Sequence, residues 1–74
     1  MSSVASSIDN LTGIDRQIKG LRLHVDEQIE RVRADARRGK DNRDERATLR
    51  FLEETLLMAE RYRDVVLDEV IGER

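Results

Sequence analysis

The chain contains no cysteine and no proline, and its only aromatic residues are one phenylalanine and one tyrosine. Without cysteine, neither a disulfide nor a thiolate metal site can stabilise it, and His24 has no second histidine with which to share a metal ion. The absence of proline, together with only four glycines, favours helices over a β-rich or collagen-like structure. We therefore expect an all-α protein without a metal or another cofactor.

Long hydrophobic runs are absent as well. No stretch approaches the roughly 18 apolar residues of a membrane span, and no basic segment precedes a hydrophobic one, as it would in a secretion signal. Charged residues make up 41% of the chain, and the formal net charge is −2. We expect a soluble, cytoplasmic protein that does not bind a membrane. Binding to a long nucleic acid duplex is not expected either, because the net charge is negative and no aromatic residue interleaves the basic residues of segment 33–50.

Apolar residues in the first half of the chain recur at spacings of three or four residues, which is the heptad pattern of packed helices. The pattern predicts a helix over residues 8–36. Residues 1–7 are small, polar and without this pattern, so we expect a flexible N-terminus. The apolar positions are Ile8, Leu11, Ile14, Ile18, Leu21, Val25, Ile29, Val32 and Ala36.

The heptad pattern stops at residues 37–42, which have the composition of a turn. Gly39 suits the left-handed position that follows a helix, and Asn42 with Glu45 resembles a capping box at the start of another helix. Two helices of similar length joined by a few residues predict an antiparallel helical hairpin. Residues 8–74 then form a single domain.

The second helix carries more than one apolar row. Its first row is interrupted by Arg63 and consists of Leu49, Leu52, Leu56, Ala59, Val66 and Val70. What we call the second row runs beside it and consists of Phe51, Thr55, Met58, Tyr62 and Val65. One partner helix cannot cover both rows, so the hairpin would expose an apolar patch.

A chain of this length buries only about 60% of its unfolded surface and usually needs further stabilisation. With no covalent or metal link available, we expect a homo-oligomer, either a dimeric four-helix bundle or a higher assembly. The predicted interface residues are Leu52, Leu56, Leu57, Met58, Tyr62, Val65, Val66, Leu67 and Val70.

Charge is distributed unevenly along the chain. Residues 33–50 hold seven basic and four acidic residues, a local net charge of +3, whereas residues 51–74 hold three basic and seven acidic ones, a local net charge of −4. The basic group gathers at the turn, where the N-terminus of the second helix adds positive partial charge. Guanidinium groups suit phosphates, so Arg43, Arg46 and Arg50 are candidate anion ligands. A solvated turn is the alternative interpretation of this cluster.

Catalysis is not expected from these residues. Glu53, Glu60, Asp64 and Asp68 share one broad face of the second helix, but acid–base chemistry needs an enclosed pocket that separates their pKa values. The chain has no glycine-rich phosphate loop and no serine–histidine–aspartate constellation. We therefore expect a protein that is not an enzyme.

Three segments, residues 18–21 (Ile-Lys-Gly-Leu), 47–50 (Ala-Thr-Leu-Arg) and 55–59 (Thr-Leu-Leu-Met-Ala), lie in helices joined by a short polar turn. Together, over about residues 14–60, this arrangement resembles the helical hairpin of phage anti-defence proteins that sequester the cyclic nucleotide signals of bacterial immunity. The resemblance implies a non-enzymatic oligomer. It also implies that Lys19 contacts a phosphate or base of the nucleotide, and that Arg50 and Thr55 do so from the second helix.

Three functions remain open from the sequence. The favoured one is a small interaction protein, encoded by a phage, whose helical surface binds a host or defence protein. The alternative is a sponge that sequesters a cyclic nucleotide through Lys19, Arg50 and the basic turn end. The third is a scaffold subunit that only assembles.

Overall fold

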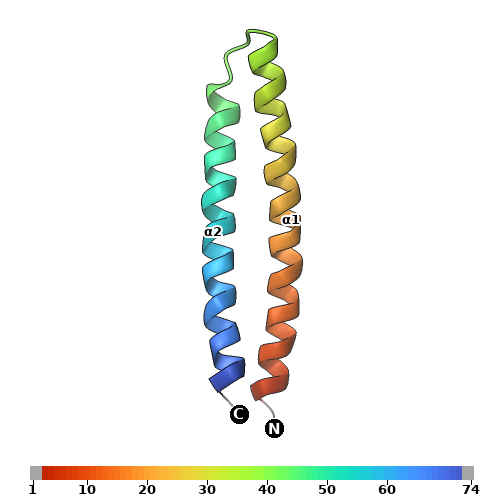
Figure 1. Ribbon diagram of the computed structural model, residues 1–74, viewed down its shortest axis with the longest axis vertical. Coiled ribbons are helices and arrows are strands. Elements are labelled where there is room, and N and C mark those ends of the chain that lie inside the picture. The colour runs from red at the N-terminus through yellow and green to blue at the C-terminus, as the bar shows by residue number, and fades with distance from the viewer. Residues whose placement is uncertain (1–2, 73–74) are drawn as a thin grey trace.

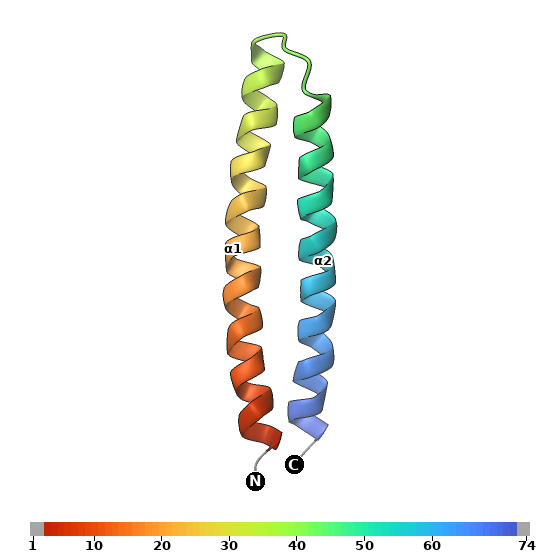
Figure 2. The ribbon, with the colours of Figure 1, turned by 180° about the vertical axis from the view of Figure 1, so that it is seen from behind.

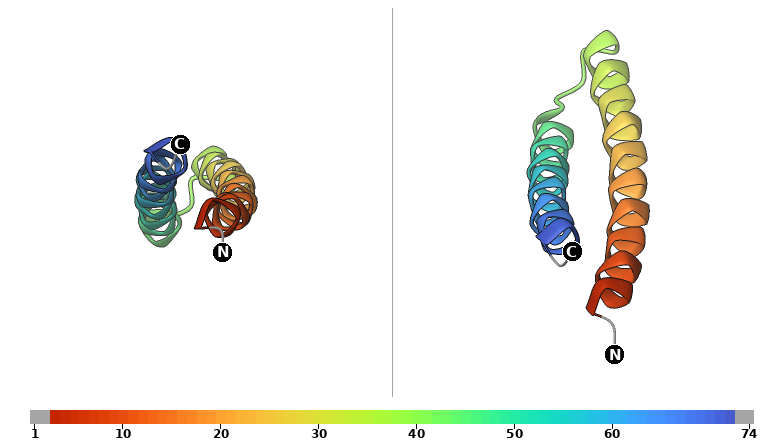
Figure 3. Two further views of the ribbon diagram at one scale, coloured as in Figure 1. Left: turned by 90° about the horizontal axis from the view of Figure 1, so that it is seen from below. Right: turned by 60° about the horizontal axis from the view of Figure 1, so that its bottom comes forward.

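The computed structural model describes the backbone of residues 3–72 and the side chains of residues 8–72. It contains two helices, α1 (Ser3–Arg37) and α2 (Arg43–Gly72), which run antiparallel and side by side, with the end of α1 at the turn extending past the start of α2 (Figures 1 and 2). The hairpin measures 58 × 14 × 13 Å, and the end-on view in Figure 3 shows no third layer. The predicted all-α hairpin is thus confirmed.

The start of α1 differs from the prediction. The helix already begins at Ser3, so its backbone includes most of the segment 1–7 that we expected to be flexible; Met1 and Ser2 lie outside the described residues. The heptad pattern marks where a helix packs against a partner, and a helix can extend beyond its packed part. The pattern therefore placed the start of α1 too late.

The end of α1 forms the predicted glycine cap. Gly39 has a φ of 69°, in the left-handed region that glycine adopts without steric cost. The backbone N–H of Lys40 donates to the carbonyl of Asp35 at 2.9 Å, and that of Gly39 donates to the carbonyl of Ala36 at 3.2 Å. These two bonds define a Schellman motif, which satisfies carbonyls at the helix end and reverses the chain.

Asn42 is the N-cap of α2, as predicted, but the side chain that accepts a backbone N–H there belongs to the preceding residue. The backbone N–H of Arg46 donates to the carbonyl of Asn42 at 2.9 Å, which puts Asn42 at the N-cap. The carboxylate that accepts a backbone N–H here is that of Asp41, at 3.1 Å from the nitrogen of Arg43. The side-chain bonds of a capping box between Asn42 and Glu45 are not among the hydrogen bonds of residues 8–72.

The core is a single seam between the two helices. Ile14, Ile18 and Val66 are buried together, with Leu11, Leu56 and Ala59 packed around them, and Val25 is buried further toward the turn. These residues belong to the heptad pattern of α1 and to the first row of α2, so the first row is the one that packs against α1. Two helices enclose little volume, so none of the described side chains is completely buried.

One buried polar side chain was not predicted. Gln28 is buried in the seam, and its Nε2 donates to the backbone carbonyl of Glu45 at 2.8 Å. A buried amide is tolerated when it is hydrogen-bonded, and this bond joins α1 to the first turn of α2. Its position three residues after Val25 placed it on the packed face, but no sequence pattern indicated its partner.

Glycine substitutions should have opposite effects in the helix and in the turn. Gly20 lies inside α1, and a Cβ added there would meet no atom within 4 Å, so Gly20→Ala should raise the free energy of unfolding by about 0.5–1 kcal/mol. Gly39→Ala should lower it by about 1 kcal/mol, because an alanine is strained at positive φ. Urea denaturation at one fixed protein concentration measures both. A destabilising Gly20→Ala would contradict the open space beside α1.

Candidate interaction surface

The second row lies on the outer surface of α2. Phe51, Met58, Tyr62 and Val65 are 66%, 70%, 56% and 55% exposed. Their spacing of three and four residues places them in one line along the helix, away from the residues that contact α1. Exposed apolar side chains are ordinary when scattered, but a continuous row of large ones marks an interaction surface.

The exposed area of the whole hairpin leads to the same conclusion. The hairpin exposes 5939 Å², whereas a compact monomer of this mass is expected to expose about 4,700 Å². The excess of about 1,200 Å² exceeds the roughly 800 Å² that each partner contributes to a standard protein interface. The single-layer hairpin therefore has ample surface for a stable contact with another chain.

The structure divides the predicted interface residues into two groups. Val66 is only 3% exposed, so almost none of its surface remains for a contact with another chain. Four further residues are half-buried within the hairpin, namely Leu52, Leu56, Leu67 and Val70. The remaining four are exposed, namely Leu57, Met58, Tyr62 and Val65. Phe51, which our interface prediction omitted although it belongs to the second row, is as exposed as Met58.

Shallow grooves run between the second row and α1. Thr55 and Ala59 line one of them with Gly20 of α1, and Tyr62 lines the next with Gly13. A Cβ added at either glycine would meet no atom within 4 Å. The surface of α1 beside the second row is therefore not filled by side chains at these two positions. The Thr55 hydroxyl donates to the carbonyl of Phe51 at 2.8 Å, which satisfies it within α2.

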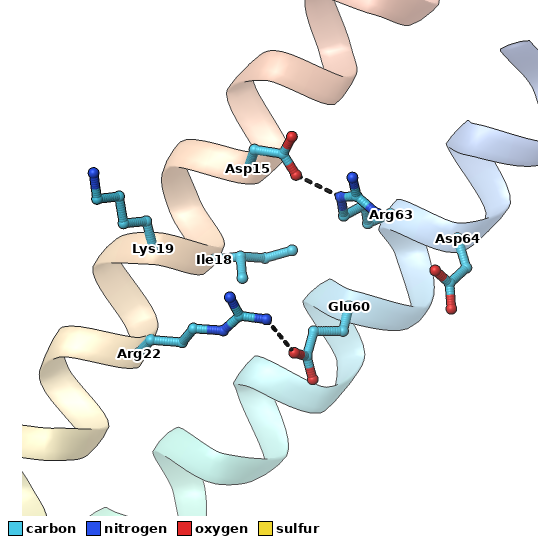
Figure 4. A pocket seen from close by; sticks show the side chains of 7 residues that line it. All are labelled: Asp15, Ile18, Lys19, Arg22, Glu60, Arg63 and Asp64. Atoms are coloured by element: carbon cyan, nitrogen blue, oxygen red, sulfur yellow. Dashed lines mark hydrogen bonds and ion pairs between the residues drawn. The ribbon is translucent and has the colours of Figure 1, made fainter.

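The opposite side of the hairpin is held by ion pairs (Figure 4). Arg63, which interrupts the first row, pairs with Asp15, and Arg22 pairs with Glu60 at 2.9 Å. Lys19 lines the same groove, but its ammonium group points away from both pairs (Figure 4). Both pairs join α1 to α2 across the edge of the seam.

The basic residues near the turn are only partly free. Arg43, Arg46 and Arg50 line one surface at the start of α2. Arg43 is paired with Asp41 at 2.9 Å, whereas the ion pairs found over residues 8–72 involve neither Arg46 nor Arg50. The structure thus brings the three predicted arginines together and leaves two of them available to an anion.

Lys19 and Thr55 are not close to this basic surface. Lys19 lies beside Glu60, about ten residues along α2 from Arg50, which corresponds to about 15 Å along the helix axis. Thr55 lines a different groove, next to Gly20. The residues that the resemblance implies as nucleotide-binding, Lys19, Arg50 and Thr55, therefore lie on separate parts of one hairpin.

Within the described part of the chain, no group of three or more histidine, cysteine or acidic residues is placed to hold a metal ion. Neither α1 nor α2, over the residues described, has the length of apolar sequence that crossing a membrane requires. Comparisons with known protein families, curated proteins and solved structures gave no match. The assignment of function rests on the surface itself.

The Asp41–Arg43 contact can be tested by titration. The Arg43 guanidinium, and then its backbone N–H, hold the pKa of the Asp41 carboxyl below its ordinary value. The contact therefore stabilises the start of α2 at neutral pH, and this stabilisation is lost as the pH falls through the lowered pKa. Arg43→Ala should raise the pKa of Asp41, measured by NMR titration of its carboxyl carbon. Arg46→Ala serves as the control and should leave it unchanged; an unchanged pKa in Arg43→Ala would disprove the contact.

Proposed function

We propose that this chain is a non-enzymatic protein-binding module that acts by packing the second row of α2 against a helix of another protein chain. The observation that carries the proposal is the exposure of four large apolar side chains at heptad spacing on one helix. Such a row is what an amphipathic helix recognises, because each apolar side chain can fit between four residues of the facing helix.

The second row is long enough to hold a helix. From Phe51 to Val65 it spans about 21 Å of α2, and the row contains no charged residue over that length. The resemblance to phage anti-defence hairpins favours a host or defence protein as the biological target. Such a protein would be blocked by occupation of its surface, without any reaction.

A photo-crosslinking residue placed at Met58 tests this proposal. A crosslinker at Met58 should join this chain covalently to its partner chain and give one discrete product. Phe51→Glu in the same chain should abolish that product, because it puts a charge into the row. The matched control position is Glu53, which is also exposed on α2 but lies outside the second row. Equal crosslinking from Met58 and Glu53, or a product that survives Phe51→Glu, would contradict the proposal.

A second candidate function, supported by the free guanidinium groups of Arg46 and Arg50, is the sequestration of a cyclic nucleotide. The two side chains lie one helical turn apart on the same surface and can both contact phosphate oxygens. Because Lys19 lies about 15 Å further along the hairpin, a small ligand that contacts Lys19 as well as Arg50 would have to bind between two copies of the chain.

Thermal melting with cyclic di- and trinucleotides tests this second candidate. A ligand at 100 times its Kd adds about 2.7 kcal/mol to the free energy of unfolding, which raises the melting temperature measurably. Arg46→Glu and Arg50→Glu should each remove the effect. Arg16→Glu is the control, since it makes the same change of charge on an exposed site of α1 far from the turn. A melting temperature that no nucleotide alters would exclude this function.

A further inference from the structure

Charged residues flank the second row on its side away from α1. One flank of the row is already occupied, because Ala59 and Val66 pack against α1. The other flank ends at Asp68 and contains, within the length of the row, Glu54 and Arg61, which are one heptad apart and both exposed. Neither takes part in an ion pair with another residue of the described chain. An apolar row bordered by unpaired charges of opposite sign is typical of a helix that selects its partner by charge.

We propose that the second row is covered by the second row of another copy of this chain, with the two α2 helices antiparallel and Glu54 of each copy facing Arg61 of the other. This inference rests on the proposed function and names the partner that fits the same surface. The two hairpins would then form a four-helix bundle in which each α2 contacts its own α1 on one side and the partner's α2 on the other.

The charges next to the row distinguish the two possible orientations. In an antiparallel pair, residues at the heptad position of Glu54 and Arg61 face the same position of the partner. Twofold symmetry then forms two Glu54–Arg61 pairs at once. In a parallel pair the same residues would face the flank that contains Ala59 and Val66, where no opposite charge is available. The antiparallel orientation is therefore favoured.

The alignment of the two helices along their axes is also determined by charge. When Phe51 packs beside the partner's Tyr62 and Thr55 beside the partner's Met58, the seam is uncharged from residue 48 to residue 65, and carboxylates (Asp44 and the partner's Glu69) occur only at its two ends. A shift by one heptad in one direction would place Phe51 against the partner's Glu69 and bring the two Arg61 side chains together. A shift in the other direction would bring the two Glu54 side chains together. Of the three alignments, only the first avoids like-charge contacts between the flanking residues Glu54 and Arg61.

The charge of the whole helix supports the same orientation. Within α2, residues 43–50 hold three arginines and two carboxylates, a net charge of +1, whereas residues 51–72 hold two basic and six acidic residues, a net charge of −4. Antiparallel pairing lays the basic start of each α2 along the acidic end of the other. Parallel pairing would instead place like charges side by side.

Reciprocal charge exchange tests the inference in the intact protein. In Glu54→Arg both flanking positions are positive, and in Arg61→Glu both are negative, so each variant alone should dimerise about tenfold more weakly than wild type. An equimolar mixture of the two variants should recover the wild-type dissociation constant, because every pair is then attractive. Sedimentation velocity measures all three samples, and recovery in the mixture also shows that both variants fold.

Glu53→Arg is the matched control. It makes the same change of charge at an exposed site beside Glu54 but outside the row and its flanks, so its dissociation constant should equal that of wild type. A dimer that is not strengthened by mixing the two variants would overturn the antiparallel pairing. A monomeric wild type that still crosslinks from Met58 to a different protein would overturn this inference and leave the proposed function standing.

Discussion

The structure depends on one hydrophobic seam between α1 and α2, and on how little that seam can enclose. Ile14, Ile18 and Val66 form its centre. The ion pairs Arg22–Glu60 and Arg63–Asp15 lie at its exposed edge, where an individual pair contributes at most about 1 kcal/mol. Burial of the seam is thus the main source of stability. Because a two-helix layer has no opposite side to cover it, the rest of α2 remains at the surface.

Because of this limit, α2 carries two apolar rows with different surroundings. Its first row supplies the inner side of the seam, through residues such as Leu56 and Val66. Its second row, which includes Phe51 and Met58, is left exposed with the same heptad spacing. A helix with two apolar rows is normal inside a bundle, where it has two neighbours. In the hairpin α2 has one such neighbour, α1, and the second row is the surface on which we propose that another chain packs.

The turn sets which faces of the two helices meet. The glycine cap at Gly39 reverses the chain, and the contact between Asp41 and the backbone of Arg43 starts α2 immediately afterwards. The bond from Gln28 to the carbonyl of Glu45 then holds that first turn of α2 against α1. Arg37 offsets the negative partial charge at the end of α1, whereas Arg46 and Arg50, near the start of α2, provide the basic surface on which the second candidate function rests.

The sequence alone determined the two rows of α2, the packed face of α1 and the glycine cap, because heptad spacing and positive φ are properties of a single segment. It did not reveal that α1 begins at Ser3, that Asp41 accepts the N–H at the start of α2, or that Gln28 is buried. Nor did it place Arg63 beside Asp15 or separate Lys19 from Arg50. These features depend on how far one helix is shifted along the other. Spacing within a helix gives the angle of a residue around its axis, whereas only the packed hairpin decides which residues of two helices lie at the same height.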